Sequence, residues 1–246
     1  MKELTLPESH LLLPRIHGFS EDFDHLVTAD RWTTILTDAG TALVLDGAGG
    51  VLELTASDGT VADNDEVYVH TTKELFLFAN EKPLELISRV KWAEANTDDA
   101  NVLFGLMNAP AANHLLDDGA GPAASYSGAV FFKTDGGTTW NFETSLAGAQ
   151  TTTALAATSP NGAADWHSLK ITVKNRDATT LIITPWIDEN GGQDFKIALD
   201  ANGNQVQHTI ALGSPTEMGV IMGVKNGGAN NEVIDFDYVS CWQLRA

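Results

Sequence analysis

The chain has 246 residues, with 33 Asp and Glu against 14 Lys and Arg, which gives a formal net charge of −19 at pH 7. Hydrophobic residues make up 43% of the sequence, which is enough to bury a large core and excludes global disorder. The charge argues against nucleic acid or an anionic membrane as a partner, because both need a broad cluster of Lys and Arg. Cys241 is the single cysteine, so no internal disulfide can form.

The N-terminal residues contain no recognisable targeting segment. The apolar run 11–13 is closed by Pro14 and is far shorter than the apolar core of a secretion signal. No stretch approaches the roughly 20 apolar residues of a membrane span. We therefore expect synthesis and folding in a cytoplasm.

Taken in chain order, the sequence predicts an extended N-terminal arm at 1–18 and one domain at 19–246. Strict alternation of apolar and polar residues at 84–92 and 168–174 predicts half-buried antiparallel strands. The same pattern at 194–200 would place Phe195, Ile197 and Leu199 on the buried side. Further strands are predicted at 42–45, 51–55, 66–70, 75–78, 102–107, 129–134, 139–144, 180–187, 206–210, 218–224 and 233–242.

Asp-Gly and Asn-Gly turn signals separate these segments, for example at 46–47, 161–162 and 226–227. The longest predicted loop is 109–127, and the only helical candidate is a turn at 113–117. Many short strands with regular turns predict an all-β sandwich or barrel.

Three stretches carry a family resemblance. They are 19–24 with Arg31 and Trp32, the pair 166–173 and 183–191, and the final strand 234–242. Together they resemble the concanavalin A-like lectin/glucanase jelly rolls, including LamG-like modules. That resemblance implies an antiparallel two-sheet jelly-roll β-sandwich.

A narrower resemblance rests on segments 96–102, 117–122 and 125–130. These resemble jelly-roll proteins that tailed phages and prophages encode near their capsid genes. The resemblance implies a virion structural or decoration protein, located in the virion after assembly in the host cytoplasm.

Catalytic patterns are missing from the sequence. Glucanases of this fold place carboxylates on one strand as Glu-x-Asp-x-Glu, so that alternate residues share a face, and this triplet does not occur. Glu232 and Asp235 are three residues apart and would face opposite sides of a strand. No Gly-x-Ser-x-Gly motif occurs, and no pair of the seven histidines has metal-ligand spacing. We therefore expect no enzyme, no catalytic residues and no cofactor.

Calcium is the one ion that the sequence leaves open, because proteins of this class often hold it with loop carboxylates. Asp63, Asp65 and Glu66 form one candidate cluster, and Asp98 with Asp99 forms another, with plain solvated turns as the alternative.

Two aromatic residues near loops, Tyr126 and Trp140, are candidates for stacking against a sugar ring. Trp140 shares a face of its strand with Phe142, which favours packing in the core instead.

The favoured function is a non-enzymatic virion module, a capsid decoration or stabilising protein. It would dock on a capsid or other virion protein through Leu11, Leu12, Leu13 and Ile16 of the arm, because an apolar strip is costly to expose. Display in many copies would suit a homo-oligomer. The alternative is a lectin-like carbohydrate-binding module for host-surface glycans, with or without calcium. A divergent glycoside hydrolase is the third hypothesis.

Overall fold

A computed structural model describes residues 15–245 except 29, 47–48, 58–59, 95–97, 118, 163 and 214–215. In this part of the chain the structure consists of strands, with no α-helix. The first strands are β1 (Ile16–Glu21), β2 (Trp32–Leu36), β3 (Thr41–Leu45), β4 (Val51–Thr55), β5 (Glu66–Thr71), β6 (Phe76–Leu77), β7 (Leu84–Trp92), β8 (Ala100–Met107) and β9 (Gly128–Lys133). They are followed by β10 (Thr139–Leu146), β11 (Ala149–Thr158), β12 (His167–Asp177), β13 (Thr180–Asp188), β14 (Lys196–Ile197), β15 (His208–Ala211), β16 (Glu217–Asn226) and β17 (Val233–Leu244).

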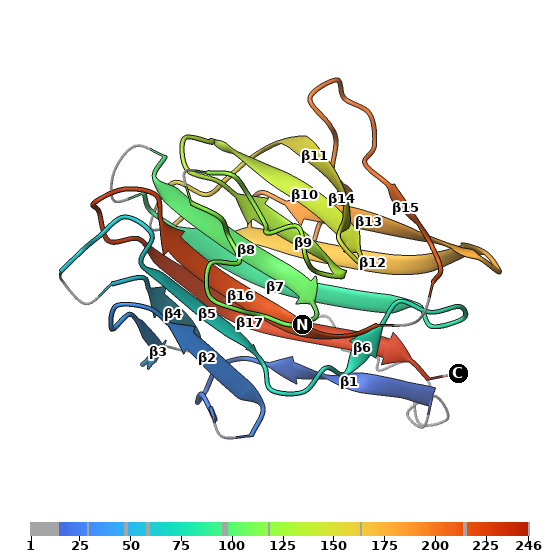
Figure 1. Cartoon of the computed structure of the whole chain (residues 1–246), viewed down its shortest axis with the longest axis horizontal. Helices are drawn as coiled ribbons and strands as arrows, with labels where there is room; N and C mark the ends of the chain where they lie inside the picture. The colour runs from blue at the N-terminus through green and yellow to red at the C-terminus, as the bar shows by residue number, and fades with distance from the viewer. Residues whose placement is uncertain are drawn as a thin grey trace, which may run out of the picture.

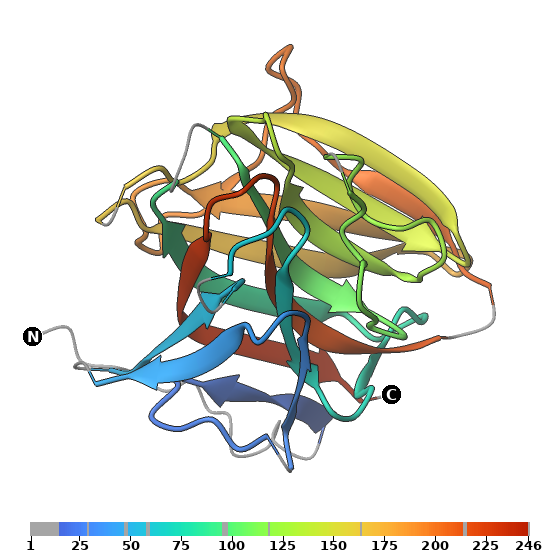
Figure 2. The same cartoon turned by 60° about the vertical axis from the view of Figure 1, so that its left-hand side comes forward.

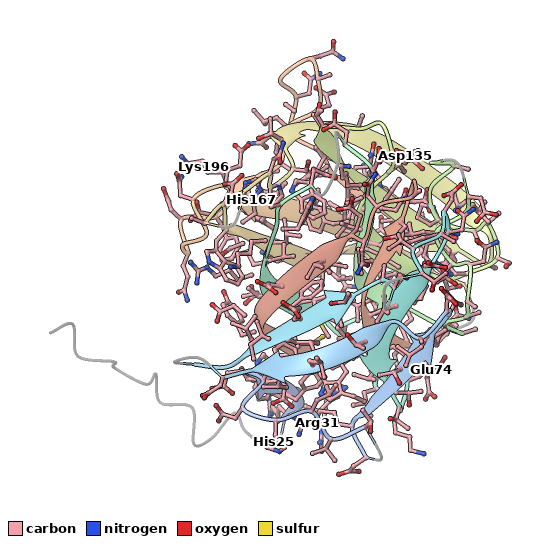
Figure 3. All side chains as sticks on the ribbon, turned by 90° about the vertical axis from the view of Figure 1, so that its left-hand side faces the viewer. His25, Arg31, Glu74, Asp135, His167 and Lys196 are labelled. Atoms are coloured by element: carbon pink, nitrogen blue, oxygen red, sulfur yellow. The ribbon has the colours of Figure 1, made fainter. Side chains whose placement is uncertain are left out.

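The strands form two antiparallel sheets that stack as a sandwich (Figure 1). One has nine strands in the order β14-β13-β12-β7-β17-β4-β3, with β1 beside β17 and β15 beside β13. The other has eight strands in the order β11-β10-β9-β8-β16-β5-β2, with β6 beside β16. In Figure 3, Lys196 and His167 of the nine-stranded sheet lie on the opposite side from Glu74 and Asp135, which adjoin the eight-stranded sheet. The predicted all-β sandwich is therefore confirmed.

The main core lies between the two sheets. Alternating residues of β7, from Leu84 to Trp92, face inward as the sequence predicted. Trp140 and Phe142 are both fully buried there, which confirms core packing for Trp140. Cys241 is also fully buried, and burial raises the pKa of its thiol well above the ordinary value. The thiol is therefore protonated and inert at neutral pH.

Two boundaries differ from the sequence prediction. β1 lies beside the end of β17 (Figure 1). It begins at Ile16, opposite Leu244, so residues 16–18 belong to the sheet and not to an arm. Leu11, Leu12 and Leu13 lie outside the described residues. The expected strand at 194–200 is confirmed only as the two-residue β14, and its predicted buried face is wrong. Leu199 and Asp200 form isolated bridges with Gln205 and Leu155, and Leu199 is 40% exposed while its neighbour Ala198 is buried.

A second apolar cluster covers the outer face of the eight-stranded sheet. The connection between β8 and β9, residues 108–127, folds back across this face (Figure 2). Its Leu115 and Tyr126 pack against outward side chains of the strands, namely Tyr68, Leu103, Met107, Val130, Phe132 and Ile221. We call this connection the covering loop, because it closes the face of the sheet that it crosses.

Candidate functional site

A buried ion network holds the covering loop on the eight-stranded sheet. The Nζ atom of Lys225 lies 3.9 Å from Glu66 Oε2, and both side chains are almost fully buried. The same ammonium donates to the Leu115 carbonyl at 2.9 Å and to Asn113 Oδ1 and Asp117 Oδ1, both at 2.5 Å. Three residues of the loop are thereby tied to one side chain of β16.

Tyr68 completes this network. Its hydroxyl donates to Glu66 Oε2 at 2.9 Å and accepts the backbone N–H of Leu115 at 3.1 Å. Burial raises the pKa of Glu66, and burial together with Glu66 raises the pKa of Tyr68 well above its ordinary value. Groups with shifted pKa values often mark a functional site. Here each group has a protein partner and is covered by the loop, so the network serves to anchor the loop.

The two aromatic residues that the sequence proposed for sugar stacking are both buried. Tyr126 is 2% exposed, and its hydroxyl donates to Glu143 Oε1 at 2.7 Å. Trp140 is fully buried in the main core. Neither ring presents a face to solvent, so the structure offers no sugar platform at either residue.

The predicted calcium clusters do not form as the sequence placed them. Asp63 and Asp99, one from each cluster, lie near Asp135, whose pKa is raised by burial and by these two charges. Asp65 accepts the backbone N–H of Ala62 at 2.8 Å, while the neighbouring Glu66 belongs to the buried network with Lys225. Among the described residues, no group of three or more His, Cys, Asp or Glu side chains could hold a metal ion.

An open aromatic surface lies on the other side of the molecule. Three of the six tryptophans, Trp166, Trp186 and Trp242, are partly exposed and belong to the strands of the nine-stranded sheet or adjoin them. Trp242 is 42% exposed, the most open aromatic ring among the described large hydrophobic side chains. Cations lie over the other two: the Arg89 guanidinium is 4.5 Å from the Trp166 ring centre.

A register shift in β17 is what turns Trp242 outward. Ile234 and Phe236 face the core in the first half of the strand, and Val239 and Cys241 do so in the second half. The pairing with β7 shifts by one residue between Phe236 and Tyr238. One extra residue exchanges the two faces of a strand, so Trp242 lies on the outer face of the sheet.

Beside Trp242 the outer face carries a groove of about 360 Å³. Trp242 lies opposite Glu85 of β7, and Glu85 lies opposite Thr172 of β12, so these three side chains cross the sheet in one row. The groove is lined by residues 16, 83–85, 172–174 and 242–244. It therefore combines an exposed ring with carboxylate, hydroxyl and, at Lys174, ammonium groups.

The indole N–H groups on this face are already bonded within the protein. Trp242 Nε1 donates to Ser240 Oγ at 2.7 Å, and Trp186 Nε1 donates to Thr172 Oγ1 at 2.9 Å. These bonds hold each indole in one orientation while leaving the face of Trp242 open. Rings fixed in this way lose little conformational entropy when a ligand stacks on them.

A second hollow, of about 240 Å³, lies near Asp188 and the exposed Lys196 (Figure 3). Asp188 already accepts the backbone N–H groups of Asn190 and Asp194. No aromatic side chain lines this hollow. The groove beside Trp242 is therefore the better candidate site.

No protein-family model matches the chain, and no curated protein matches its sequence. Solved structures do match its fold. The carbohydrate recognition domain of Emp47p superposes with a TM-score of 0.59 at 10% identity, covering 95% of this chain and 98% of that one. The exoplasmic/lumenal domain of VIP36, bound to Ca²⁺ and Man3GlcNAc, gives 0.57 at 13% identity, covering 94% and 89%.

An enzyme has the same fold. The endo-β-1,4-glucuronan lyase of the fungus Trichoderma reesei gives a TM-score of 0.56 at 14% identity, covering 91% of this chain and 94% of that one. The two sheets and these matches define the concanavalin A-like jelly-roll fold, as the sequence resemblance implied.

The expectation that the chain is not an enzyme is contradicted by this match, because the fold is shared by enzymes and lectins. The missing sequence motifs do not exclude an enzyme, because a glucuronan lyase and an endo-1,3-β-glucanase share this fold at 14% identity. In the described part of the chain, no helix is long and apolar enough to cross a membrane.

Proposed function

We propose that the chain binds a carbohydrate polymer or glycan in the groove beside Trp242. The observation that carries this proposal is the exposed Trp242 ring, fixed by Ser240 and bordering a groove with polar walls. Sugar rings present one flat apolar side and a rim of hydroxyls, so they need an open ring and nearby hydrogen-bonding groups. Glu85 and Thr172 supply the latter in the same row across the sheet.

The opposite face of the sandwich is a poor candidate. The covering loop occupies the outer side of the eight-stranded sheet, where Tyr68 and Lys225 are bonded to the loop itself. Carbohydrate binding by Emp47p and VIP36, which their names and bound sugar indicate, is consistent with the proposal. At 10–13% identity, their binding residues do not transfer to this chain.

Calcium dependence and virion docking remain predictions. The VIP36 domain has been solved with bound Ca²⁺, so binding assays should be run both with and without Ca²⁺. Docking on a capsid protein depended on Leu11, Leu12 and Leu13, outside the described residues, and on Ile16, which belongs to β1. The similar structures named above are lectin domains and an enzyme, so the virion role and the location in a virion stay predictions.

The test compares wild type with Trp242→Ala in a glycan array and in gels containing soluble polysaccharides, with and without Ca²⁺. Loss of a central aromatic anchor costs about 2 kcal/mol or more, so affinity should fall at least about 30-fold. Leu43→Ala is the matched control, because it removes another exposed apolar side chain, 53% exposed, from β3 at the far edge of the same sheet. Binding by Trp242→Ala at wild-type strength, or no binding by wild type, would refute the proposal. Polymer length is followed in the same samples, which separates binding from cleavage.

A further inference from the structure

A group of cationic side chains lies on three strands of the nine-stranded sheet. Six of the 14 Lys and Arg residues belong to β7, β12 and β14: Arg89, Lys91, Lys170, Lys174, Arg176 and Lys196. Two more, Lys133 and Lys225, are buried in ion pairs elsewhere. A ligand on the outer face of the nine-stranded sheet therefore meets a local group of cations, although the chain as a whole is acidic.

Part of this charge is neutralised on the sheet itself. Arg89 pairs with Asp237 at 2.9 Å, and Lys91 pairs with Asp235 at 3.2 Å. Lys170 and Lys174 differ, because no described carboxylate lies within 4 Å of either ammonium group. Arg176 of the same strand is also exposed and makes no ion pair with a described carboxylate, so β12 carries three such cations.

Both lysines lie next to the proposed groove. Lys174 is exposed and lines it, two residues from Thr172 on β12. Lys170 lies two residues from Thr172 in the other direction, and its Nζ is 5.0 Å from the Trp186 ring centre and 4.4 Å from that of Phe195. Packing against the two rings restricts the Lys170 side chain, so its charge has a defined place on the face.

Thr172 lies between the two lysines and has a free donor. Its Oγ1 accepts the Trp186 indole N–H, which leaves its own hydroxyl hydrogen for a ligand oxygen. The groove walls thus offer donors at Thr172 and Lys174 against one carboxylate at Glu85, and Lys170 adds a cation two residues beyond Thr172 on the same strand. This pattern suits a ligand that is rich in acceptors and carries negative charge.

We infer that the ligand of this groove is an anionic polysaccharide that bears carboxylate or sulfate groups. The inference rests on the proposed function and specifies its substrate class: a sugar ring stacks on Trp242 while an acidic group of the polymer lies between Lys170 and Lys174. The chain as a whole carries a net charge of −19, so its surface outside this strip repels such a polymer. Binding is therefore confined to this strip and weakens as salt rises.

The experiment measures the affinity of the full chain for polyglucuronate, a sulfated dextran and unmodified dextran at 50 and 500 mM NaCl. Wild type should prefer the anionic polymers, and the preference should shrink at high salt. Lys174→Gln should weaken polyglucuronate binding about threefold to fivefold, as for one exposed ion pair, and leave weak dextran binding unchanged. Lys73→Gln is the matched control, since Lys73 is exposed and lies between β5 and β6 of the other sheet. The affinities for polyglucuronate and for sulfated dextran, compared with each other, show whether the groove prefers a carboxylate or a sulfate group.

The outcomes distinguish a failure of the anionic ligand from a failure of carbohydrate binding itself. Equal, salt-independent binding to charged and uncharged dextran that still needs Trp242 would overturn the anionic ligand and leave carbohydrate binding intact. Absence of binding to every polymer would overturn both. Equally strong, Lys174-dependent binding to a DNA oligonucleotide or to phosphatidylserine vesicles would overturn the assignment to a polysaccharide. Folding of each variant is checked by its urea unfolding midpoint, which should match that of wild type because these sites are exposed.

Discussion

The indole Nε1 of Trp242 donates to Ser240 Oγ over 2.7 Å, between two consecutive outward positions of β17. Trp186 of β13 makes a comparable bond to Thr172 on the neighbouring strand β12. A partly exposed tryptophan normally turns its polar edge to water and changes rotamer freely. On this face each ring is held by a neighbouring hydroxyl, which leaves its apolar surface as the part available to a ligand.

Replacement of Ser240 by Ala should therefore weaken carbohydrate binding without removing it. The Trp242 ring would become mobile, and immobilising such a side chain on binding costs about 0.5–1.5 kcal/mol, or about threefold to tenfold in affinity. Stability should change little, because the bond is exposed to solvent. Ser20→Ala is a suitable control, since Ser20 is exposed and lies opposite Ser240 on β1. Identical affinities for wild type and Ser240→Ala would show that the hydroxyl does not position the ring.

Trp242 also shows where reading the sequence reaches its limit. Strict alternation counted from Phe236 places Trp242 on the inner side, and the shift between Phe236 and Tyr238 reverses that assignment. One sign of the shift is the adjacent pair Asp237 and Tyr238. Both side chains are half-exposed, whereas in a regular strand one of two neighbouring residues faces the core. A sequence does not distinguish such a bulge from ordinary variation in polarity, so the candidate groove could not be predicted.

The strands themselves were predicted where one face is apolar throughout. β4 and β7 match their predicted bounds, because regular alternation fixes both the length and the register of a half-buried strand. β11 was missed, since Ala149–Thr158 is mostly Ala and Thr and buries mainly Leu155. At 194–200 the alternation was real but misleading, because Phe195 packs beneath Lys170 on the outer face and not in the core. Such cases depend on tertiary neighbours that local sequence does not contain.

Lys225→Met tests the anchoring of the covering loop. The change leaves Glu66 buried without its cation and also removes the donor to Leu115 and Asp117. Breaking one partner of a buried pair costs about 3–5 kcal/mol, so the urea midpoint should fall sharply. The combined variant Lys225→Met with Glu66→Gln should recover part of that loss, because the second change removes the unpaired charge.

Limited proteolysis adds a local measurement to this prediction. The covering loop should be cleaved faster in Lys225→Met than in wild type under conditions where both are folded. Asp117→Asn is the control, since the Asp117 side chain is 52% exposed and its pair with Lys225 should contribute about 1 kcal/mol or less. Unchanged cleavage in Lys225→Met would mean that the apolar cluster alone holds the loop.

Gly223→Ala should destabilise the eight-stranded sheet. A Cβ atom at Gly223 would lie 2.0 Å from Cδ1 and 2.6 Å from Cε1 of Tyr68, which faces it across the strand pair. The Tyr68 hydroxyl is fixed at both Glu66 and Leu115, so the ring cannot move aside freely. Overpacking of this kind costs about 1–3 kcal/mol, measured as a shift in the urea midpoint. Gly213→Ala, where nothing lies within 4 Å, should stay within about 0.5 kcal/mol of wild type.

His208 should make the stability of the fold depend on pH. Its two ring nitrogens contact the hydroxyls of Thr144 at 2.9 Å and Thr153 at 3.0 Å, in a buried site between β15 and the eight-stranded sheet. Burial lowers the pKa of His208 to about 4, against an ordinary value of 6.5. Between these two pH values the unfolded chain takes up a proton that the folded chain excludes. The contribution of His208 is thus fully present above pH 6.5 and is lost as the pH falls toward 4.

The expected size follows from the two pKa values. At pH 5 the unfolded state gains about 2 kcal/mol from this one proton relative to pH 7.5. His208→Gln removes the titrating group, so the loss of stability from pH 7.5 to pH 5 in urea titrations should be about 2 kcal/mol smaller than in wild type. His25→Gln, which removes an exposed imidazole (Figure 3), should keep the wild-type difference. Burial also lowers the pKa of His114 to about 4, so wild type retains a second, similar contribution that neither variant touches. An equal pH dependence in wild type and His208→Gln would show that His208 can be protonated inside the fold, which requires water or a carboxylate to reach the ring.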